Sequence, residues 1–398
     1  MRAGYADEDP AVRDVLGAVQ ELTAGLRERA AEAERLCRLP EESVKELTEA
    51  GFFRLLRPRA FGGLAAPPQA HFAAVGALAA ACGSTGWVAS VFGVHAWHVS
   101  LFAPRTQREV WDPDAGALVS SSYAPSGTAV PVTGGYTLSG RWSFSSGCDH
   151  AQWVLLGAFV TGPEGSPPEM RAFLLSRDDY RVEAAWDTVG LRGTGSNDIL
   201  VEDVFVPARR TIGVGASAER VFPGWESNPE PLYRVPFPAM FTTAVTAPIV
   251  GTAAGAYRDH CATLRDRIAE GRPRRGDLDP AGQLRIARGS GDVDASWSQL
   301  VGNMAELYDR AERAREPGLE LRARTRRDQV LATERAVAAV DLLMVHAGGN
   351  AMRTGSGALQ RAWRDVHTGR GHAANDIERG LLPYAQQALG LDVRESMV

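Results

Sequence analysis

The first hundred or so residues carry the spacing of amphipathic helices. Between residues 11 and 36, apolar side chains recur every three or four positions with charges between them, which predicts a helix with one buried face. Pro40 opens a second predicted helix, because proline is tolerated in the first helical turn. Residues 71–81 and 87–102 are more uniformly apolar and predict two buried helices. Residues 1–115 are therefore predicted to form an N-terminal helical domain.

Near residue 115 the pattern changes to short apolar or alternating segments separated by Gly, Pro and Ser. Alternation with period two is typical of half-buried strands, and closely spaced turns are typical of antiparallel sheets. Residues 116–222 are therefore predicted to form a compact antiparallel β-barrel domain. The predicted strands are 118–123, 135–139, 152–159, 171–176, 180–184 and 199–206.

The helical spacing returns after a proline-rich connection. Long buried helices of this kind are typical of a bundle core or a subunit interface, so residues 223–398 are predicted to form a C-terminal four-helix-like bundle. The fold class is thus α+β, mainly α. The predicted helices are 239–270, 279–308, 311–324, 328–347, 358–365 and 375–389.

Composition narrows the function without naming it. The chain is 44% apolar and 23% charged, with a formal net charge of −5, which is typical of a globular protein and disfavours nucleic acid as a partner. The longest apolar run, residues 86–102, is too short to span a bilayer, so no membrane partner is expected. The four cysteines form no CxxC pair and the N-terminus has no apolar signal region. These features favour the cytoplasm and no metal site.

Candidate chemistry concentrates near the C-terminus. Residues 361–376, RAWRDVHTGRGHAAND, contain His367 and His372, and Gly348-Gly349 lies just upstream. Histidine titrates near neutral pH and is the first candidate for acid–base work. The single lysine, Lys45, lies on a predicted exposed helix, which leaves Schiff-base chemistry almost no candidate.

The segment WDTVGLRGTGSNDILVEDVFVP, residues 186–207, resembles the β-domain of the acyl-CoA dehydrogenase superfamily. The resemblance extends to PEESVKELTEAGFFRLLRP near the N-terminus, and to HAGGNAM and LQRAWRDVHTGRGHAANDIE near the C-terminus. It covers nearly the whole chain in order. It implies that family's helical, β-barrel and bundle domains, a flavin bound between barrel and bundle, and assembly as a homotetramer or homodimer.

Dehydrogenation is disfavoured by a missing carboxylate. In the dehydrogenases the usual catalytic glutamate lies nine residues after the arginine of an Arg-Asp pair. Here the pair is Arg364-Asp365, and the matching position is Ala373. The alternative position, near residues 251–256, also holds no carboxylate. Without such a base, the α-proton of a thioester has no acceptor.

Three further motifs resemble the two-component flavin-dependent monooxygenases of the same superfamily, above all their phenol-hydroxylating oxygenase components. These motifs are GVHAW (93–97), SSSYAPSG (120–127) and SGRWSFSSGCDHAQW (139–153). The resemblance implies hydroxylation of a small phenol or indole-like substrate through a flavin C4a-hydroperoxide. It also implies O2 and reduced FMN or FAD, supplied by a separate NAD(P)H:flavin reductase. The alternatives are an N-hydroxylase of an amino sugar nucleotide, an acyl-CoA dehydrogenase and a silent flavin-binding scaffold.

The resemblance assigns three catalytic residues. His372 is expected to act as the base or as the partner of the hydroperoxide, and His95 to grip the substrate hydroxyl or amine. Ser145 matches the position whose hydroxyl meets flavin N5. His98 is expected to be structural, and His367 is as much a structural or interface residue as a functional one.

The remaining assignments concern the flavin. Ser122 and Tyr123 are expected on the strand that passes over the edge of the flavin ring, and Trp142 and Phe144 beside the isoalloxazine. Thr194 and Ser196 are expected in a loop that lines the pocket, and Gly348-Gly349 in a turn that contacts the nucleotide. Trp142 and Phe144 are expected on one face of a strand. Ordinary strand packing and turn chemistry are the competing explanations. Arg274 and Arg275 are candidates for the flavin phosphate.

Overall fold

The N-terminal part of the chain is a helical layer, as predicted. The computed structural model describes residues 9–161, 168–214, 221–353, 355, 357–393 and 397. The predicted first helix is divided at Arg29 into two helices, and a short helix before the β-domain was not predicted. The helices are α1 (Pro10–Glu28), α2 (Ala30–Leu36), α3 (Glu41–Glu49), α4 (Pro68–Ala81), α5 (Gly83–Val99) and α6 (Pro104–Trp111).

The middle of the chain forms one seven-stranded sheet with the order β5-β6-β2-β1-β3-β4-β7. All pairings are antiparallel except that of β1 with β3, which is parallel. The prediction of a purely antiparallel domain is wrong at that pair. The strands are β1 (Val119–Val132), β2 (Gly135–Ser145), β3 (Trp153–Val160), β4 (Glu169–Ser176), β5 (Arg181–Glu183), β6 (Asn197–Pro207) and β7 (Thr211–Gly213).

The C-terminal part is a bundle of long helices. The predicted helix 311–324 does not exist as a separate element, because α8 continues to Glu312 and α9 begins at Leu319. α7 is apolar and long enough to cross a membrane, but 89% of its most apolar window is buried inside the protein, as in a core helix. The helices are α7 (Phe237–Ala269), α8 (Pro280–Glu312), α9 (Leu319–Ala347), α10 (Ala358–Arg370) and α11 (Ile377–Ala388).

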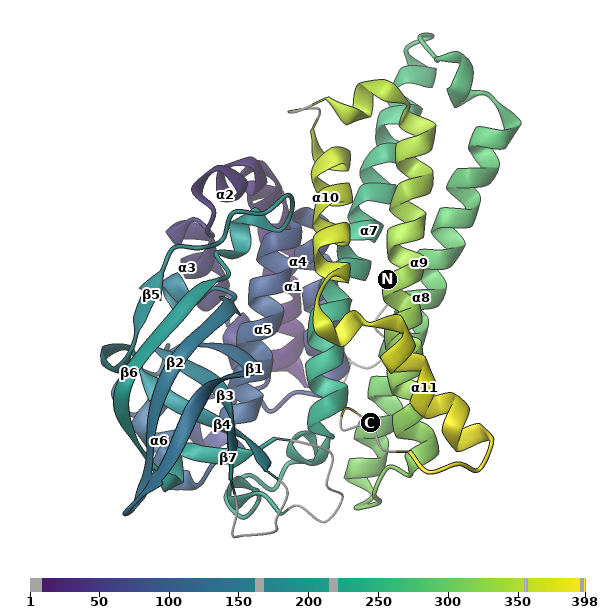
Figure 1. Ribbon diagram of the computed structural model, residues 1–398. Helices are drawn as coiled ribbons and strands as arrows, with labels where there is room; N and C mark the ends of the chain where they lie inside the picture. Colours follow the sequence, from purple (N-terminus) through teal and green to yellow (C-terminus); the bar gives the residue numbers. More distant parts are fainter. Residues whose placement is uncertain are drawn as a thin grey trace.

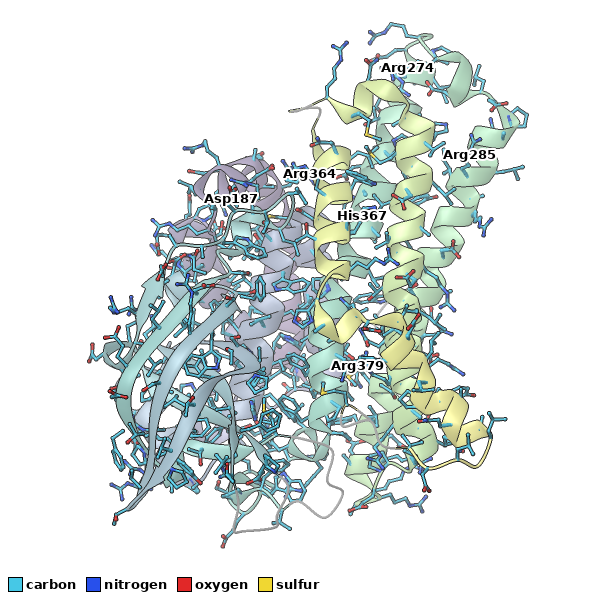
Figure 2. The ribbon with its side chains drawn as sticks, viewed as in Figure 1. Asp187, Arg274, Arg285, Arg364, His367 and Arg379 are labelled. Carbon is cyan, nitrogen blue, oxygen red and sulfur yellow. The ribbon has the colours of Figure 1, made fainter. Side chains whose placement is uncertain are left out.

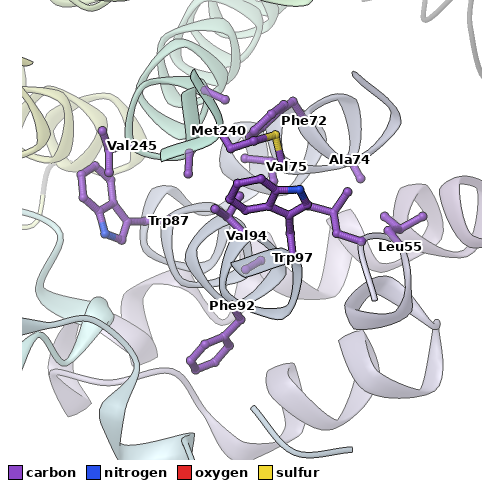
Figure 3. Packing of buried hydrophobic residues seen from close by; sticks show 14 of the residues in the cluster. Leu55, Phe72, Ala74, Val75, Trp87, Phe92, Val94, Trp97, Met240 and Val245 are labelled. Atoms are coloured by element: carbon purple, nitrogen blue, oxygen red, sulfur yellow. The ribbon is translucent and has the colours of Figure 1, made fainter. Parts of the chain in front are cut away.

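The helical layer lies between the sheet and the bundle (Figure 1). One core cluster joins residues of α4 and α5 to residues of α7, α8 and α9, with Trp97 and Met240 fully buried in it (Figure 3). A second cluster fills the sheet and centres on Trp142 and Phe173. The helical layer and the bundle therefore share one core. α5, which contacts both β1 and α7, lies where a site between barrel and bundle would form.

Candidate active site

His95 lies on α5, a helix whose side chains are buried almost all round. Its Nδ1 is 2.7 Å from the carbonyl oxygen of Val119 on β1. A carbonyl can only accept, so Nδ1 carries the proton and Nε2 keeps a free lone pair. That Nε2 is 2.8 Å from the hydroxyl oxygen of Ser121. Burial lowers the pKa of His95 to about 4, so the ring is a neutral acceptor near pH 7.

Tyr123 stands next to this pair, on the same face of β1 as Ser121. Its hydroxyl is 2.6 Å from Nδ1 of His98, one helical turn after His95. The Tyr123 ring meets Phe237 and Phe241 edge-on, and those two rings stack 5.6 Å apart at the start of α7. Tyr123 therefore belongs to an aromatic wall beside His95, and His98 is the hydrogen-bond partner of that wall.

His372 approaches the same aromatic wall from the end of α10. Its ring centroid lies 5.9 Å from those of Trp87 and Phe241. Its Nδ1 accepts a hydrogen bond from the backbone N–H of Ala374 at 3.1 Å. A neutral ring that accepts at Nδ1 must carry its proton on Nε2. Burial, followed by the positive charge of Arg326, lowers the pKa of His372 to about 4. Nε2–H is therefore a neutral donor.

Ser145 and its neighbours form a polar edge at the end of β2. The Ser145 hydroxyl is fully buried and has no hydrogen-bond partner among the described residues. Buried hydroxyls are normally paired, so this one fits a ligand atom such as the flavin nitrogen that the resemblance implies. The next hydroxyl, on Ser146, bonds Trp87 Nε1 at 3.1 Å and Ser196 at 2.8 Å.

Ser122 and Thr194, assigned to the flavin, have their hydroxyls committed within the protein. Ser122 donates to the carbonyl of Ser143 at 2.8 Å, on the face of β1 opposite to Tyr123. Thr194 bonds the carbonyl of Leu191 and lies 2.7 Å from Ser196. These hydroxyls brace the polar edge and can meet a ligand only by exchanging these bonds.

Trp142 and Phe144 do not share a face, so that expectation is wrong. Trp142 is fully buried in the sheet core, where its Nε1 donates to the Gly157 carbonyl at 2.7 Å. Phe144 is 67% exposed and meets Trp186 edge-on. The pairing of β2 with β6 shifts register between Trp142 and Ser145, and Phe144 has a positive φ of 70°. The bulge reverses the alternation. Trp142 has no surface to offer a flavin in this structure.

Gly348-Gly349 is not brought to this site within one chain. The pair follows α9, and the whole of α10 lies between it and His372. Thirteen helical residues span about 20 Å. Arg274 lies at this same far end of the bundle, whereas Arg379 lies just after the His372 turn (Figure 2). The side chain of Arg275 lies outside the described residues.

Two other polar residues of the C-terminal stretch, His367 and Asp365, have hydrogen-bond partners within the protein. His367 Nε2 lies 3.0 Å from Asp341 on α9, which ties α10 to the bundle. Asp365 is buried and accepts the Leu191 N–H at 2.6 Å, and burial raises its pKa to about 6. Ala373 is exposed beside His372 and supplies no base. Across the part of the chain that the structure describes, no three metal-ligating side chains cluster.

Sequence reasoning missed Ser121, Trp87 and Phe241. The period-two rule was sufficient for Ser121, because Ser121 and Tyr123 share a face of β1 whereas Ser122 faces the other way. Trp87 and Phe241 stand in uniformly apolar helices, where no sequence pattern separates a site wall from the core. Their role depends on the approach of His372 from more than a hundred residues away.

The comparisons with known proteins agree with this fold. Residues 10–117 match the family model "Acyl-CoA dehydrogenase, N-terminal domain", and residues 243–377 match "Acyl-CoA dehydrogenase, C-terminal domain". The chain is 47% identical, over 94% of its length and 97% of the relative's, to the flavin-dependent monooxygenase, oxygenase subunit HsaA, of Rhodococcus jostii RHA1.

Solved structures extend the same likeness. The crystal structure of 3-HSA hydroxylase from Rhodococcus sp. RHA1 superposes with a TM-score of 0.93 at 46% identity, covering 97% of this chain and 99% of that one. XiaF from Streptomyces sp., solved in complex with FADH2, superposes with a TM-score of 0.84 at 27% identity, covering 96% and 97%.

Proposed function

Because the chain belongs to the oxygenase subunits of flavin-dependent monooxygenases, built on the acyl-CoA dehydrogenase fold, we propose which residues carry its hydroxylation of an aromatic ring. His95 and Ser121 hold the ring hydroxyl of an uncharged phenol, and His372 donates toward the flavin. The observation that carries the proposal is the pair of opposite tautomers. His95 turns a lone pair toward Ser121, whereas His372 keeps its proton on Nε2.

The energetics favour His95 as a general base that acts late. A phenol ordinarily has a pKa of about 10, and burial lowers the pKa of His95 to about 4. Complete transfer before reaction would therefore cost about 8 kcal/mol. In the ground state, Nε2 of His95 instead accepts a hydrogen bond from the ring hydroxyl in place of the one from Ser121, whose hydroxyl then donates to the phenol oxygen. It takes the proton as the carbon–oxygen bond forms, when the hydroxyl becomes far more acidic.

The lining favours an uncharged ring over an aromatic acid. The rings that face His95 and His372 are those of Tyr123, Phe241 and Trp87, with Phe237 stacked on Phe241 and Ser121 as the polar contact of His95. None of these described side chains carries a charge. A substrate carboxylate would lose its hydration without gaining a cation, which is costly. The flat, polarisable walls suit an extended apolar ring system.

A reduced flavin is the group that fits the polar edge. Bound there, it supplies the activated oxygen, and a separate reductase supplies its electrons. Ser145 would hold the flavin ring through its unpaired hydroxyl, Ser196 and Thr194 would keep that edge in place, and exposed Phe144 would cover the ring. Either FMN or FAD is compatible with these contacts.

Gly348-Gly349 can contribute to a flavin site only if two copies of the chain assemble. The pair lies at the far end of the bundle from His372, so it can contact a flavin nucleotide only if that flavin is held by another subunit. We infer a homodimer or homotetramer in the cytoplasm. Light scattering on the purified chain tests the assembly, and a monomer would remove the glycines from the flavin site.

The experiment that tests the function supplies chemically reduced FMN or FAD, oxygen and a series of phenols. Hydroxylated product and hydrogen peroxide are measured for each. We expect uncharged phenols to be hydroxylated, and 4-hydroxyphenylacetate to give mostly peroxide. Preferential hydroxylation of the carboxylate-bearing phenol would refute the proposed uncharged substrate class. Absence of product with every phenol and both flavins would refute the assignment of the site.

A further inference from the structure

Arg326 is an arginine buried beneath the turn that carries His372. It lies on α9 with 4% of its surface exposed. Its Nη1 donates to the carbonyl of Ala374 at 2.6 Å and also bonds the side-chain oxygen of Gln329. The guanidinium is thus held against the backbone of the active-site turn.

The turn is clamped by a buried polar network around Asn375. The side-chain oxygen Oδ1 of Asn375 accepts from Gln329 Nε2 at 2.6 Å, and its side-chain Nδ2 donates to the Gly369 carbonyl at 2.8 Å. The Asn375 backbone N–H bonds the His372 carbonyl at 2.7 Å. The turn is thus tied to both α9 and α10, and the backbone around His372 has little freedom.

Ala374 connects the arginine to the histidine directly. Its carbonyl accepts from Arg326 and its N–H donates to His372 Nδ1. The arginine therefore orients the residue whose N–H occupies the histidine lone pair. If His372 became protonated, its Nδ1–H would face that backbone N–H, and the ring would lose its partner.

We propose that Arg326 is a positioning residue: through Ala374 it fixes the proton of His372 on Nε2 and keeps the ring neutral. The consequence for catalysis, that His372 remains a donor to the flavin, rests on the proposed function. The positioning itself does not need a flavin.

The charges around His372 support this assignment. Burial and the Arg326 charge lower its pKa to about 4. Among the described residues, the other charged side chains on the elements packed against it are held elsewhere. On α10, Arg370 pairs with Glu334 of α9. Asp376 caps α11 through the Arg379 N–H. The facing parts of α5 and α7 contribute Trp87 and Phe241, which carry no charge.

The test compares Arg326→Gln and Arg326→Lys with Arg324→Gln in flavin-free protein. Arg324 lies on the same helix and pairs with Glu306, away from the turn, which makes it the matched control. Histidine labelled with ¹⁵N reports by NMR which ring nitrogen is protonated and at what pH. The His372 resonance is assigned by its loss in His372→Gln.

We expect the wild type and Arg324→Gln to keep the Nε2–H form down to about pH 5. In Arg326→Gln, the pKa of His372 should rise above about 4 but stay below its ordinary 6.5, because burial, the larger cause, remains. Both tautomers should then be present. Arg326→Lys should keep the pKa low but mix the tautomers, because ammonium does not reproduce the guanidinium geometry. If Arg326→Gln does not fold, Arg326→Lys still tests the proposal. An Nδ1–H tautomer in the wild type, an unchanged titration in Arg326→Gln, or a single Nε2–H tautomer in Arg326→Lys overturns the proposal.

A second readout separates the positioning role of Arg326 from the proposed role of His372 at the flavin. With reduced flavin, oxygen and a hydroxylated phenol, the ratio of product to peroxide should stay constant from pH 8 to about pH 5 in the wild type. In Arg326→Gln the ratio should begin to fall at a higher pH than in the wild type and be severalfold lower by about pH 5. A changed NMR titration with an unchanged product ratio would keep the positioning role of Arg326 and refute the role of His372 at the flavin.

Discussion

His95 is buried and His372 half-buried, and both are neutral and lie beside the same aromatic wall, yet the fold gives them opposite hydrogen-bonding roles. His95 faces a strand carbonyl, which obliges Nδ1 to donate and leaves Nε2 as an acceptor. His372 faces a backbone N–H, which obliges Nδ1 to accept and leaves Nε2 as a donor. The difference shows that the backbone group behind each ring, and not the residue type, decides which histidine can act as a base.

The largest effect on activity is expected when the acceptor, His95, is removed. We expect His95→Gln to lower hydroxylation by at least about 100-fold, because an amide does not replace a general base in proton transfer. Flavin should still be oxidised, with hydrogen peroxide as the product. Oxygen consumption and product are measured together. The control is His367→Gln, which removes a histidine that bonds Asp341 on the bundle; product formation within twofold of wild type is expected there. Equal losses in both variants would contradict a specific role for His95.

Removal of the donor, His372, should lower hydroxylation less than removal of His95, and a substitute N–H donor should restore part of the loss. His372→Ala should divert most oxygen to peroxide, with product falling on the order of tenfold. His372→Gln keeps an N–H donor of similar reach, so it should recover part of the product. An amide cannot become an imidazolium, so its product ratio should not vary with pH. If the glutamine variant were as poor as the alanine variant, donation from Nε2 would not be what His372 contributes.

The pH dependence of stability tests whether both rings are neutral. Burial lowers the pKa of each to about 4, against an ordinary 6.5 in the unfolded chain. Between these values the unfolded state binds more protons, so the free energy of unfolding decreases as pH falls from about 6.5 to 4. One such histidine accounts for about 3 kcal/mol at pH 4.

Buried His71 and His98 add to the same trend, because burial lowers the pKa of each to about 3. Thermal unfolding should therefore shift down by on the order of 10 °C from pH 7 to pH 5. His95→Gln and His372→Gln should each flatten this dependence by a similar amount. A variant whose melting temperature keeps the full wild-type slope would identify a ring whose pKa is not lowered by folding.

Most of this fold could be predicted from the sequence, because apolar spacing reports burial directly. The helices and the strand regions follow that spacing, whereas the parallel pairing of β1 with β3 does not, since pairing depends on chain topology. At the site, the sequence predicted which residues are candidates better than it predicted where their side chains point. Trp142 and Phe144 look equivalent in sequence, but a register shift and one positive φ send one into the core and the other to the surface.

The tautomers could not be predicted at all. The sequence marks His95 and His372 as candidates, but the partner of the first is a carbonyl on β1 and the partner of the second is an N–H two residues on. Arg326 is hidden for a similar reason. In the sequence it stands in the arginine-rich run of residues 322–327, which is typical of a solvated helix end, and only the folded chain brings it beneath Ala374.

The smallest expected effect is on substrate binding, and it distinguishes the two faces of β1 beside His95. Ser121→Ala removes the hydroxyl that meets His95 Nε2, whereas Ser122→Ala removes one that bonds the Ser143 carbonyl on the opposite face. A single neutral hydrogen bond contributes about 1 kcal/mol, so Ser121→Ala should raise KM for the phenol about fivefold and change kcat little. Ser122→Ala should leave KM unchanged. The reverse order would mean that the substrate hydroxyl approaches from the other side of the strand, and His95 would then have no proton to accept.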